Sequence, residues 1–197
     1  MKILIIGGTG NISTPITKEL QKIGDYRITL FNHDNGKPDW LDEGVQVISG
    51  ERSDLPLFEK TLFAGGNYDC VVDMICFEPE DAEKDIQLFA GRTRQFIFCS
   101  TVDVFSKTPA CYPVTEDSPL GALPSFPYAY KKMKCEEFLW EAHRHDRNGC
   151  RFSDRRGYRM DTWNCSELHR SAGRKPRMAF HRLCSNHLRH IVQYAVI

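Results

Sequence analysis

Two residues suited to proton transfer stand four positions apart, at Tyr128 and Lys132. Side chains at positions i and i+4 share one face of a helix, and an ammonium group beside a phenol is expected to lower the phenol's pKa. The phenol could then exchange a proton with a substrate hydroxyl. The pattern therefore predicts Tyr128 as an acid–base group and Lys132 as its partner. Tyr130 and Lys134 repeat the spacing, and a solvated helix face would also show such pairs.

A hydroxyl group precedes this pair in a position suited to the same reaction. Thr101 directly follows residues 96–100, an apolar segment that is typical of a buried strand. Open α/β sheets bind ligands at the carboxyl ends of their strands, so we expect Thr101 to hydrogen-bond the reacting oxygen and to orient the tyrosine. The alternative is a strand-end threonine that only satisfies backbone groups.

A glycine-rich turn lies between an apolar run at residues 2–6 and a helical pattern, and its sequence is GGTGNIS. Gly7 suits a tight turn, and Gly10 leaves bare backbone where a phosphate could approach. Asn11 and Ile12 open the helix, whose N-terminus would favour the pyrophosphate of a dinucleotide. The turn predicts that NAD or NADP binds here, although an ordinary strand–helix turn can be rich in glycine too.

Two further positions are expected to contact the adenosine half of this cofactor. Asn32 ends the second predicted strand, where an acid would bind a ribose hydroxyl and an arginine would favour a 2′-phosphate. Since neither is present, the choice between NAD and NADP stays open. Glu51 follows the third predicted strand and is expected to face the adenine; the alternative is a surface acid paired with Arg52. Asp34 either reaches the ribose or is a solvated turn residue.

Alternating strands and helices are expected to position these residues. The predicted strands are 2–6, 28–32, 45–48, 70–74 and 96–100, and the predicted helices are 11–23, 54–63, 79–89 and 128–145. Such alternation indicates crossover connections and a parallel sheet, so the expected fold class is α/β with a Rossmann-like, doubly wound sheet. The NAD(P)-binding domain is expected to span residues 1–150.

The order of the motifs resembles the extended short-chain dehydrogenase/reductase family, which comprises the NAD-dependent epimerases and dehydratases. The resemblance is carried by GGTGNIS near the N-terminus, CSTVDVF at the fifth predicted strand, and YAYKK followed by Glu136. The chain is similar in particular to the sugar-nucleotide 4-epimerases and to their relatives near the chloroplast stem-loop RNA-binding proteins. The resemblance covers about residues 1–150.

This resemblance implies hydride transfer between a nicotinamide and a hydroxyl-bearing carbon of a small-molecule substrate, with a nucleotide sugar as one expected class. It implies that Thr101 is catalytic, that Tyr128 is the base, and that Lys132 is the lysine that also holds the cofactor ribose. Glu136 stands four residues after Lys132, as in the family pattern YxxxKxxxE, and favours this pair over the second one. Family members often dimerise through the helix that bears this pair, so a homodimer is expected.

Three positions depart from the family pattern. Phe105 stands in place of the usual tyrosine, Ser13 in place of the third glycine, and Asn32 in place of the acid. None of these changes abolishes cofactor binding, so the expected function is that of an NAD(P)-dependent, epimerase/dehydratase-like oxidoreductase. The alternative is a non-catalytic dinucleotide-binding module that acts as a cofactor sensor or associates with RNA.

Charge and composition argue against several other classes. The formal net charge of the whole chain is zero, so no nucleic-acid partner is expected. No apolar run approaches a membrane span or a secretory signal, and none of the eight cysteines forms a CxxC pair. We therefore expect a cytoplasmic protein with reduced thiols and no membrane partner.

The last part of the chain does not continue the pattern. Residues 1–150 carry 16 Lys+Arg and 23 Asp+Glu, whereas residues 151–197 carry 10 and 3. A strand soon after residue 150 would bury Asp154 or Arg155 without a partner. We expect the sixth strand and most of the substrate domain to be missing, which would leave an unpaired sheet edge. The segment is interpreted as out-of-frame translation or a truncation with a foreign end; the alternative is a genuine basic tail for acidic partners.

One pattern in this segment resembles a metal site. Its members are His181, Cys184, His187 and His190, which recur every three residues. Histidine and cysteine suit zinc, but three-residue steps drift around a helix, so the four side chains would not converge on one ion. No metal site is predicted.

Overall fold

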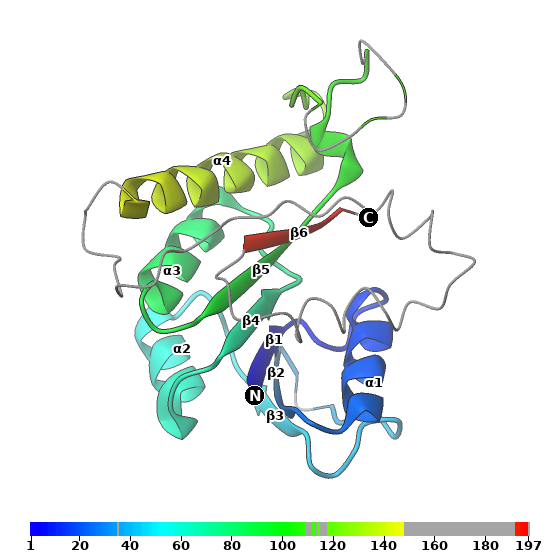
Figure 1. Cartoon of the computed structure of the whole chain (residues 1–197), viewed down its shortest axis with the longest axis vertical. Coiled ribbons are helices and arrows are strands. Elements are labelled where there is room, and N and C mark those ends of the chain that lie inside the picture. Colours follow the sequence, from blue (N-terminus) through cyan, green and yellow to red (C-terminus); the bar gives the residue numbers. More distant parts are fainter. Residues whose placement is uncertain (35, 109–111, 113, 115–117, 148–191, 197) are drawn as a thin grey trace.

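A parallel sheet with helices on both faces forms the described part of the chain (Figure 1). The computed structural model describes all residues except 35, 109–111, 113, 115–117, 148–191 and 197. The strands are β1 (Lys2–Ile6), β2 (Arg27–Asn32), β3 (Gln46–Ser49), β4 (Cys70–Asp73), β5 (Gln95–Ser100) and β6 (Val192–Val196), in the spatial order β3-β2-β1-β4-β5-β6. The predicted Rossmann-like α/β class is confirmed.

Four helices connect these strands. They are α1 (Ser13–Ile23), α2 (Leu55–Leu62), α3 (Pro79–Phe89) and α4 (Pro127–Arg147), together with the 3-10 turns η1 (Phe63–Gly65) and η2 (Val102–Val104). Local sequence explains their ends. The Asp54 carboxylate accepts a hydrogen bond from the Leu57 amide and begins α2, while Gly24, at φ +80°, ends α1. Each predicted end of these elements lies within two residues of the observed one.

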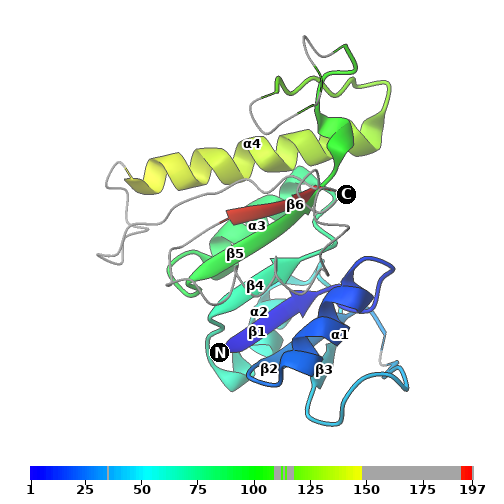
Figure 2. The ribbon, with the colours of Figure 1, turned by 45° about the vertical axis from the view of Figure 1, so that its right-hand side comes forward.

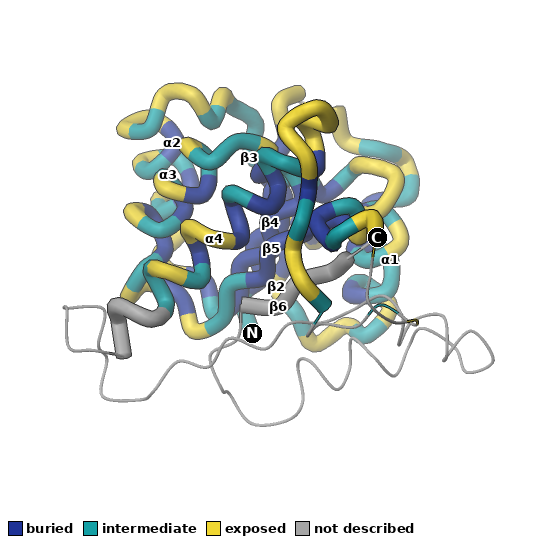
Figure 3. Tube along the Cα trace, turned by 90° about the horizontal axis from the view of Figure 1, so that it is seen from above, coloured by how far each residue is buried: buried dark blue, intermediate teal, exposed yellow. Residues whose placement is uncertain are grey.

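The helices divide between the two faces of the sheet. Helix α1 covers one face, and α2, α3 and α4 lie against the other (Figures 1 and 2). In β1, Ile5 belongs to the same apolar cluster as Leu20 of α1, whereas the next residue, Ile6, packs with Phe58 of α2. Burial on both faces explains why this strand is a continuous apolar run. Figure 3 shows the buried strands enclosed by partly exposed helices and loops.

The topology brings the predicted site residues to one edge of the sheet. All strand pairs are parallel, so the segments that follow β1, β2, β3 and β5 leave from the same edge. These segments contain Gly7, Glu51 and Thr101, and Asn32 is the last residue of β2. Between the neighbours β1 and β4 the strand order reverses direction, and the crevice at such a reversal is where open α/β sheets bind ligands.

The expectation of a missing sixth strand and an unpaired edge was wrong. Strand β6 pairs in parallel with β5, from Phe96 opposite Val192 to Ser100 opposite Val196. The segment VQYAV is rich in β-branched and aromatic residues, which suits a strand. The prediction failed because it considered the residues directly after position 150, whereas the strand forms near the end of the chain. The proposed foreign origin of the segment and the His/Cys pattern concern residues that lie mostly outside the described part.

The described residues also bear on the expectations about thiols and membranes. The cysteines in this part are Cys70, Cys76, Cys99 and Cys135; all four are buried, and none forms a disulfide. Over the same part of the chain, no helix combines the length and the apolar character that a bilayer crossing requires.

Candidate cofactor-binding and active site

The glycine turn after β1 is closely packed on its inner side. Gly7 has φ +80°, a conformation that favours glycine, and a Cβ atom there would lie 2.5 Å from Cγ2 of Ile75. A Cβ atom on Gly8 would lie 2.6 Å from Cδ2 of Leu30. The first two glycines are therefore required by the turn and by its neighbours, as expected for Gly7.

The outer side of the same turn is open. A Cβ atom on Gly10 would meet nothing closer than the Ser13 hydroxyl, at 3.4 Å. That hydroxyl is buried and donates to the Gly7 carbonyl at 2.5 Å, so Ser13 takes the place of a third glycine without blocking the turn. Helix α1 begins after Asn11 and Ile12, with no side-chain cap and no acid in its first turn. Of its first three residues, Thr14 donates its amide to the Gly10 carbonyl at 2.9 Å and Pro15 has no N–H group, so the Ser13 amide is the one left to an anionic group such as a pyrophosphate.

Asn32 provides a second observation that fits a dinucleotide. Its side chain is 5% exposed, and within the described residues neither its amide oxygen nor its amide nitrogen has a hydrogen-bond partner. Leaving a buried polar group unsatisfied costs roughly 1–3 kcal/mol. A ribose hydroxyl, which donates and accepts, matches both atoms of this amide.

On the side of the site where the adenosine is expected, Glu51 does not have the partner that one of the alternatives named. Glu51 is exposed and pairs with His33, with 3.0 Å between Oε1 and Nε2, so the alternative of a Glu51–Arg52 pair was wrong. Arg52 instead extends into the interior. Asp34 is exposed and accepts a hydrogen bond from the Gly36 amide at 3.2 Å, which is the behaviour of a turn residue.

Thr101 lies at the end of β5, and Tyr128 lies in the first turn of α4, which packs against η2 and β5. The Thr101 side chain is buried, and its hydroxyl accepts a hydrogen bond from the Asp103 amide at 3.3 Å, where η2 begins. This bond corresponds to the alternative in which the threonine satisfies backbone groups. Cys99 and Asp103, two residues to either side of Thr101, both act electrostatically on the Tyr128 phenol. The predicted acid–base group thus stands on the helix that packs against the turn at which the predicted hydroxyl lies.

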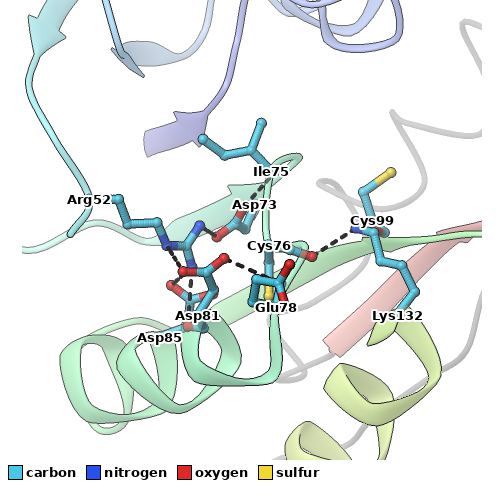
Figure 4. Close-up of polar contacts among 9 residues, drawn as sticks. All are labelled: Arg52, Asp73, Ile75, Cys76, Glu78, Asp81, Asp85, Cys99 and Lys132. Carbon is cyan, nitrogen blue, oxygen red and sulfur yellow. Dashed lines mark hydrogen bonds and ion pairs between the residues drawn. The ribbon is translucent and has the colours of Figure 1, made fainter. Parts of the chain in front are cut away.

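Lys132 is held in the interior by two backbone carbonyls. Its side chain is 1% exposed, and Nζ donates to the carbonyl oxygens of Cys76, at 2.9 Å, and Cys99, at 2.6 Å (Figure 4). The ammonium also lies over the rings of Phe77 and Phe98, 4.8 Å and 4.7 Å from their centroids. These contacts stabilise a buried cation, and no carboxylate among the described residues forms an ion pair with it.

The expected lowering of the tyrosine pKa was wrong for this arrangement. Partial burial raises the pKa of the Tyr128 phenol, and the nearby Cys99 and Asp103 act in the same direction. The physical reason is the placement of Lys132, whose hydrogen bonds go to backbone carbonyls and not to the phenol. A phenol with a raised pKa stays protonated at neutral pH, so it is ready to donate a proton.

The second Tyr-x-x-x-Lys pair is engaged elsewhere. Nζ of Lys134 pairs with Glu137 at 2.6 Å and lies 5.6 Å from the centroid of the Tyr130 ring. Both members of that ion pair are substantially exposed, which is the arrangement of an ordinary helix surface.

Sequence reasoning missed a buried ionic cluster below this edge. Arg52 contacts three carboxylates, those of Asp73, Asp81 and Asp85. An acid at the end of an apolar strand and two acids four residues apart on α3 were the available signals. The ligand atoms of Asp73, Cys76 and Asp85 lie within 4.8 Å of one another, a spacing that could suit a metal ion. The Arg52 guanidinium, at 2.5 Å from Asp73 and 2.7 Å from Asp85, already supplies a cation there.

A buried carboxyl also lies behind the lysine. The Ser100 hydroxyl donates to Oε1 of Glu136, whose side chain is almost fully buried. Burial raises the pKa of Glu136 to about 7, although the Ser100 hydrogen bond and the charge of Lys132 oppose this shift. The glutamate of the YxxxKxxxE pattern therefore faces the end of β5.

The raised pKa of Glu136 has a measurable consequence for stability. From an ordinary value of 4.5 to about 7 in the fold, the shift penalises the ionised form, so the free energy of unfolding should fall as pH rises through this window. Glu136→Gln keeps an acceptor for Ser100 and removes the charge. We expect this variant to gain on the order of 3 kcal/mol relative to the parent between pH 5 and pH 8. Denaturant unfolding at both pH values checks this.

The exposed neighbour supplies the control for that measurement. Glu137→Gln also removes one carboxylate from α4, but from its solvated face, so its effect should be small and nearly the same at both pH values. An equal stability change for Glu136→Gln at pH 5 and pH 8 would contradict the raised pKa.

Comparisons of sequence identify a family. The model of the NAD dependent epimerase/dehydratase family matches residues 3–153. UDP-glucose 4-epimerase of Bacillus subtilis (strain 168) is 29% identical over 171 residues, covering 74% of this chain and 49% of that protein. 2'-Dehydrokanamycin reductase of Streptomyces kanamyceticus is 26% identical over 137 residues, covering 70% of this chain and 37% of that protein. The chain thus spans half or less of the length of the curated relatives it matches.

Solved structures agree on the fold. dTDP-glucose 4,6-dehydratase from Bacillus anthracis str. Ames, in complex with NAD, matches with a TM-score of 0.62 at 18% identity, over 75% of this chain and 52% of that one. UDP-glucose 4-epimerase from Thermotoga maritima, with UDP-glucose, matches with a TM-score of 0.58 at 22% identity, over 73% and 52%. At these identities the likeness establishes the Rossmann-like architecture and leaves the chemistry to the residues of the site.

Proposed function

The chain belongs to the NAD-dependent epimerase/dehydratase family, and on this premise we propose that it binds a nicotinamide dinucleotide at the carboxyl edge of its sheet and takes part in hydride transfer at a hydroxyl-bearing carbon. The observation that carries the proposal is the placement at this edge of an open glycine turn, the unsatisfied amide of Asn32 and Thr101, with Tyr128 on the helix α4 that packs against η2 directly after Thr101. The cofactor, when bound, supplies the hydride donor or acceptor.

Each half of the cofactor has residues suited to it. The bare backbone of Gly7 and Gly10 and the Ser13 amide at the start of α1, next to Asn11 and Ile12, suit the pyrophosphate. Asn32 would bind a ribose hydroxyl, Glu51 would face the adenine, and Lys132 would hold the second ribose. We propose that residues 1–150 form the body of this cofactor-binding domain, to whose sheet β6 is added.

The phenol of Tyr128 is suited to donate a proton during reduction and to recover it during oxidation. Its raised pKa keeps it protonated at neutral pH, so donation to a substrate oxygen is the direction that needs no prior activation. The Thr101 hydroxyl would hydrogen-bond the same oxygen and so orient the substrate. A nucleotide sugar is the substrate class that we favour, because UDP-glucose 4-epimerases are among the relatives.

One observation favours a second candidate, a dinucleotide-binding module without turnover. In this structure the hydrogen bonds of Lys132 go to backbone carbonyls, and the pKa of Tyr128 is raised. A sensor that only binds the cofactor needs the glycine turn and Asn32 and makes no demand on the tyrosine. Turnover of a Tyr128 variant separates the two candidates.

Titration of the folded chain with NADH and, separately, NADPH tests the proposal by fluorescence. Saturable binding of either cofactor is expected. The ratio of the two affinities measures the preference between NADH and NADPH, which the presence of Asn32 does not decide. Asn32→Asp should weaken NADPH relative to NADH by about tenfold, because a carboxylate repels a 2′-phosphate and accepts from a ribose hydroxyl. Asn67→Asp, an exposed change just before β4 at the other edge, should leave the ratio unchanged. The absence of saturation by either cofactor would reject the proposal.

A further inference from the structure

The loop between β4 and α3, residues 74–78, contacts both halves of the candidate site. On the cofactor side, Ile75 occupies the space in which a Cβ atom of Gly7 would lie. On the catalytic side, the Cys76 carbonyl accepts a hydrogen bond from Lys132. The Phe77 ring covers the same ammonium and lies 6.3 Å from the ring of Tyr128. The position of this loop therefore sets the relation between the glycine turn and α4.

Asp73, the last residue of β4, ties the loop to the interior. Its Oδ1 accepts a hydrogen bond from the Ile75 amide at 2.8 Å, and its Oδ2 lies 2.5 Å from Nη1 of Arg52. The Asp73 side chain is completely buried. Arg52 is thus linked to the backbone of the loop through the Asp73 carboxylate.

Arg52 joins three segments that are separate in the sequence. It follows β3, and beyond Asp73 its guanidinium contacts the first turns of α3 (Figure 4). Nη2 lies 2.7 Å from Oδ1 of Asp85 and donates to the Asp81 carbonyl at 3.2 Å, while Nε lies 3.5 Å from Oδ1 of Asp81. A planar guanidinium has five N–H donors and can therefore contact Asp73, Asp81 and Asp85 at the same time. The smaller ammonium of a lysine could not contact all three.

The ionisation of the buried carboxyl groups in this cluster depends on Arg52. One cation faces three carboxylates, and burial together with Asp73 raises the pKa of Asp85, while Arg52 lowers it. The other titratable groups are Cys76 of the loop and Cys135 of α4; contact with Cys135 and burial raise the pKa of the Cys76 thiol. Without Arg52, ionised Asp73 and Asp85 would repel each other in a site from which water is excluded.

We propose that Arg52 is a positioning residue that holds the β4–α3 loop where Ile75 closes on the glycine turn and the Cys76 carbonyl fixes Lys132. Arg52 acts through Asp73, and its largely buried guanidinium is engaged by the carboxylates of Asp73, Asp81 and Asp85. This inference rests on the proposed function and deepens it. It says that a buried ionic cluster sets the distance between the glycine turn and α4, the two parts of the site that would hold the nicotinamide dinucleotide. A cluster that only adds stability would leave the loop's own order and its pH dependence unchanged.

Amide hydrogen exchange of residues 74–78 tests the proposal in the protein without cofactor. In Arg52→Met the protection factor of this segment should fall by roughly tenfold near pH 8 and by less near pH 6, because a lower pH favours the protonated form of Asp85, whose pKa is raised by burial and by Asp73. Arg94→Met removes an exposed arginine just before β5, at the opposite edge of the sheet, and should change nothing in this segment. Unchanged protection in Arg52→Met at both pH values would overturn the inference.

A rescue experiment separates positioning from bulk stability. In Arg52→Met/Asp73→Asn the amide oxygen still accepts from the Ile75 amide, while the repelling charge is gone. We expect NADH affinity to fall at least about tenfold in Arg52→Met near pH 8 and to recover most of this loss in the double variant. Loss of affinity that is equal at both pH values and is not rescued would contradict the proposed role.

The remaining outcomes are also decisive. If the parent chain is folded and does not bind NADH, the proposed function fails, and the exchange measurement alone decides the role of Arg52. If Arg52→Met does not fold, Arg52→Lys is the substitute, because it keeps the positive charge and lacks the forked N–H donors of the guanidinium. An intermediate loss of protection at residues 74–78 is then expected. Parent-like protection in a folded Arg52→Lys variant would then overturn the inference.

Discussion

Replacement of Tyr128 by phenylalanine should abolish turnover and leave cofactor binding intact. The change removes only the phenol oxygen, while the ring keeps its neighbours Phe77 and Phe126, each with its centroid 6.3 Å away. A positioned acid–base group contributes about 10²–10⁴-fold to a rate, so under the proposed function a loss of this size is expected in an assay with NAD and UDP-glucose as the test substrate. NADH affinity, measured by fluorescence, should stay within about twofold of the parent.

The second tyrosine of α4 is the matched control. Tyr130→Phe also removes one phenol oxygen, but the Tyr130 ring packs against the apolar cluster under α4, so turnover should stay near that of the parent. Parent-like turnover in Tyr128→Phe, or a larger loss in Tyr130→Phe, would contradict the assignment. NADH binding by a parent chain that shows no turnover would favour the module without catalysis.

The fold was predictable because its signals are local. The strand β1 is a continuous apolar run, and α3 begins at a proline with acids in its first turn, so both were expected at the observed bounds. Parallel topology then places the ends of the strands at one edge, which is why the sequence could predict that Gly7, Asn32 and Thr101 lie along the same edge of the sheet. Strand β6 was missed because its pairing with β5 spans about a hundred residues of sequence.

The electrostatics of the site were not predictable, because they depend on contacts between distant segments. The spacing of Tyr128 and Lys132 indicates a shared helix face, but the two carbonyls that accept from Lys132 lie 33 and 56 residues away in the chain. The same holds for Arg52, whose carboxylate partners belong to β4 and α3. Such contacts determine whether the pKa of a group is raised or lowered. The spacing of residues along the chain contains no information about these contacts.

The packing of the glycine turn predicts a second large effect, in Gly7→Ala. An alanine at φ +80° is strained by about 1–2 kcal/mol, and its Cβ would lie 2.5 Å from Cγ2 of Ile75, a clash that typically costs about 1–3 kcal/mol more. Ile75 cannot easily move, because its amide is bonded to Asp73. We therefore expect a lower midpoint of thermal unfolding and a loss of NADH affinity beyond about a hundredfold, since the displaced atoms form the pyrophosphate turn.

Gly24→Ala separates the strain from the clash. Gly24 has the same φ of +80°, lies at the far end of α1, and would place its Cβ atom with nothing within 4 Å. It should therefore show the strain alone, with NADH affinity unchanged. In Gly7→Ala/Ile75→Ala the clash is relieved, so part of the lost affinity should return if the closeness of Ile75 to the turn is the cause. Equal effects of Gly7→Ala and Gly24→Ala on NADH affinity would show that the turn does not hold the cofactor.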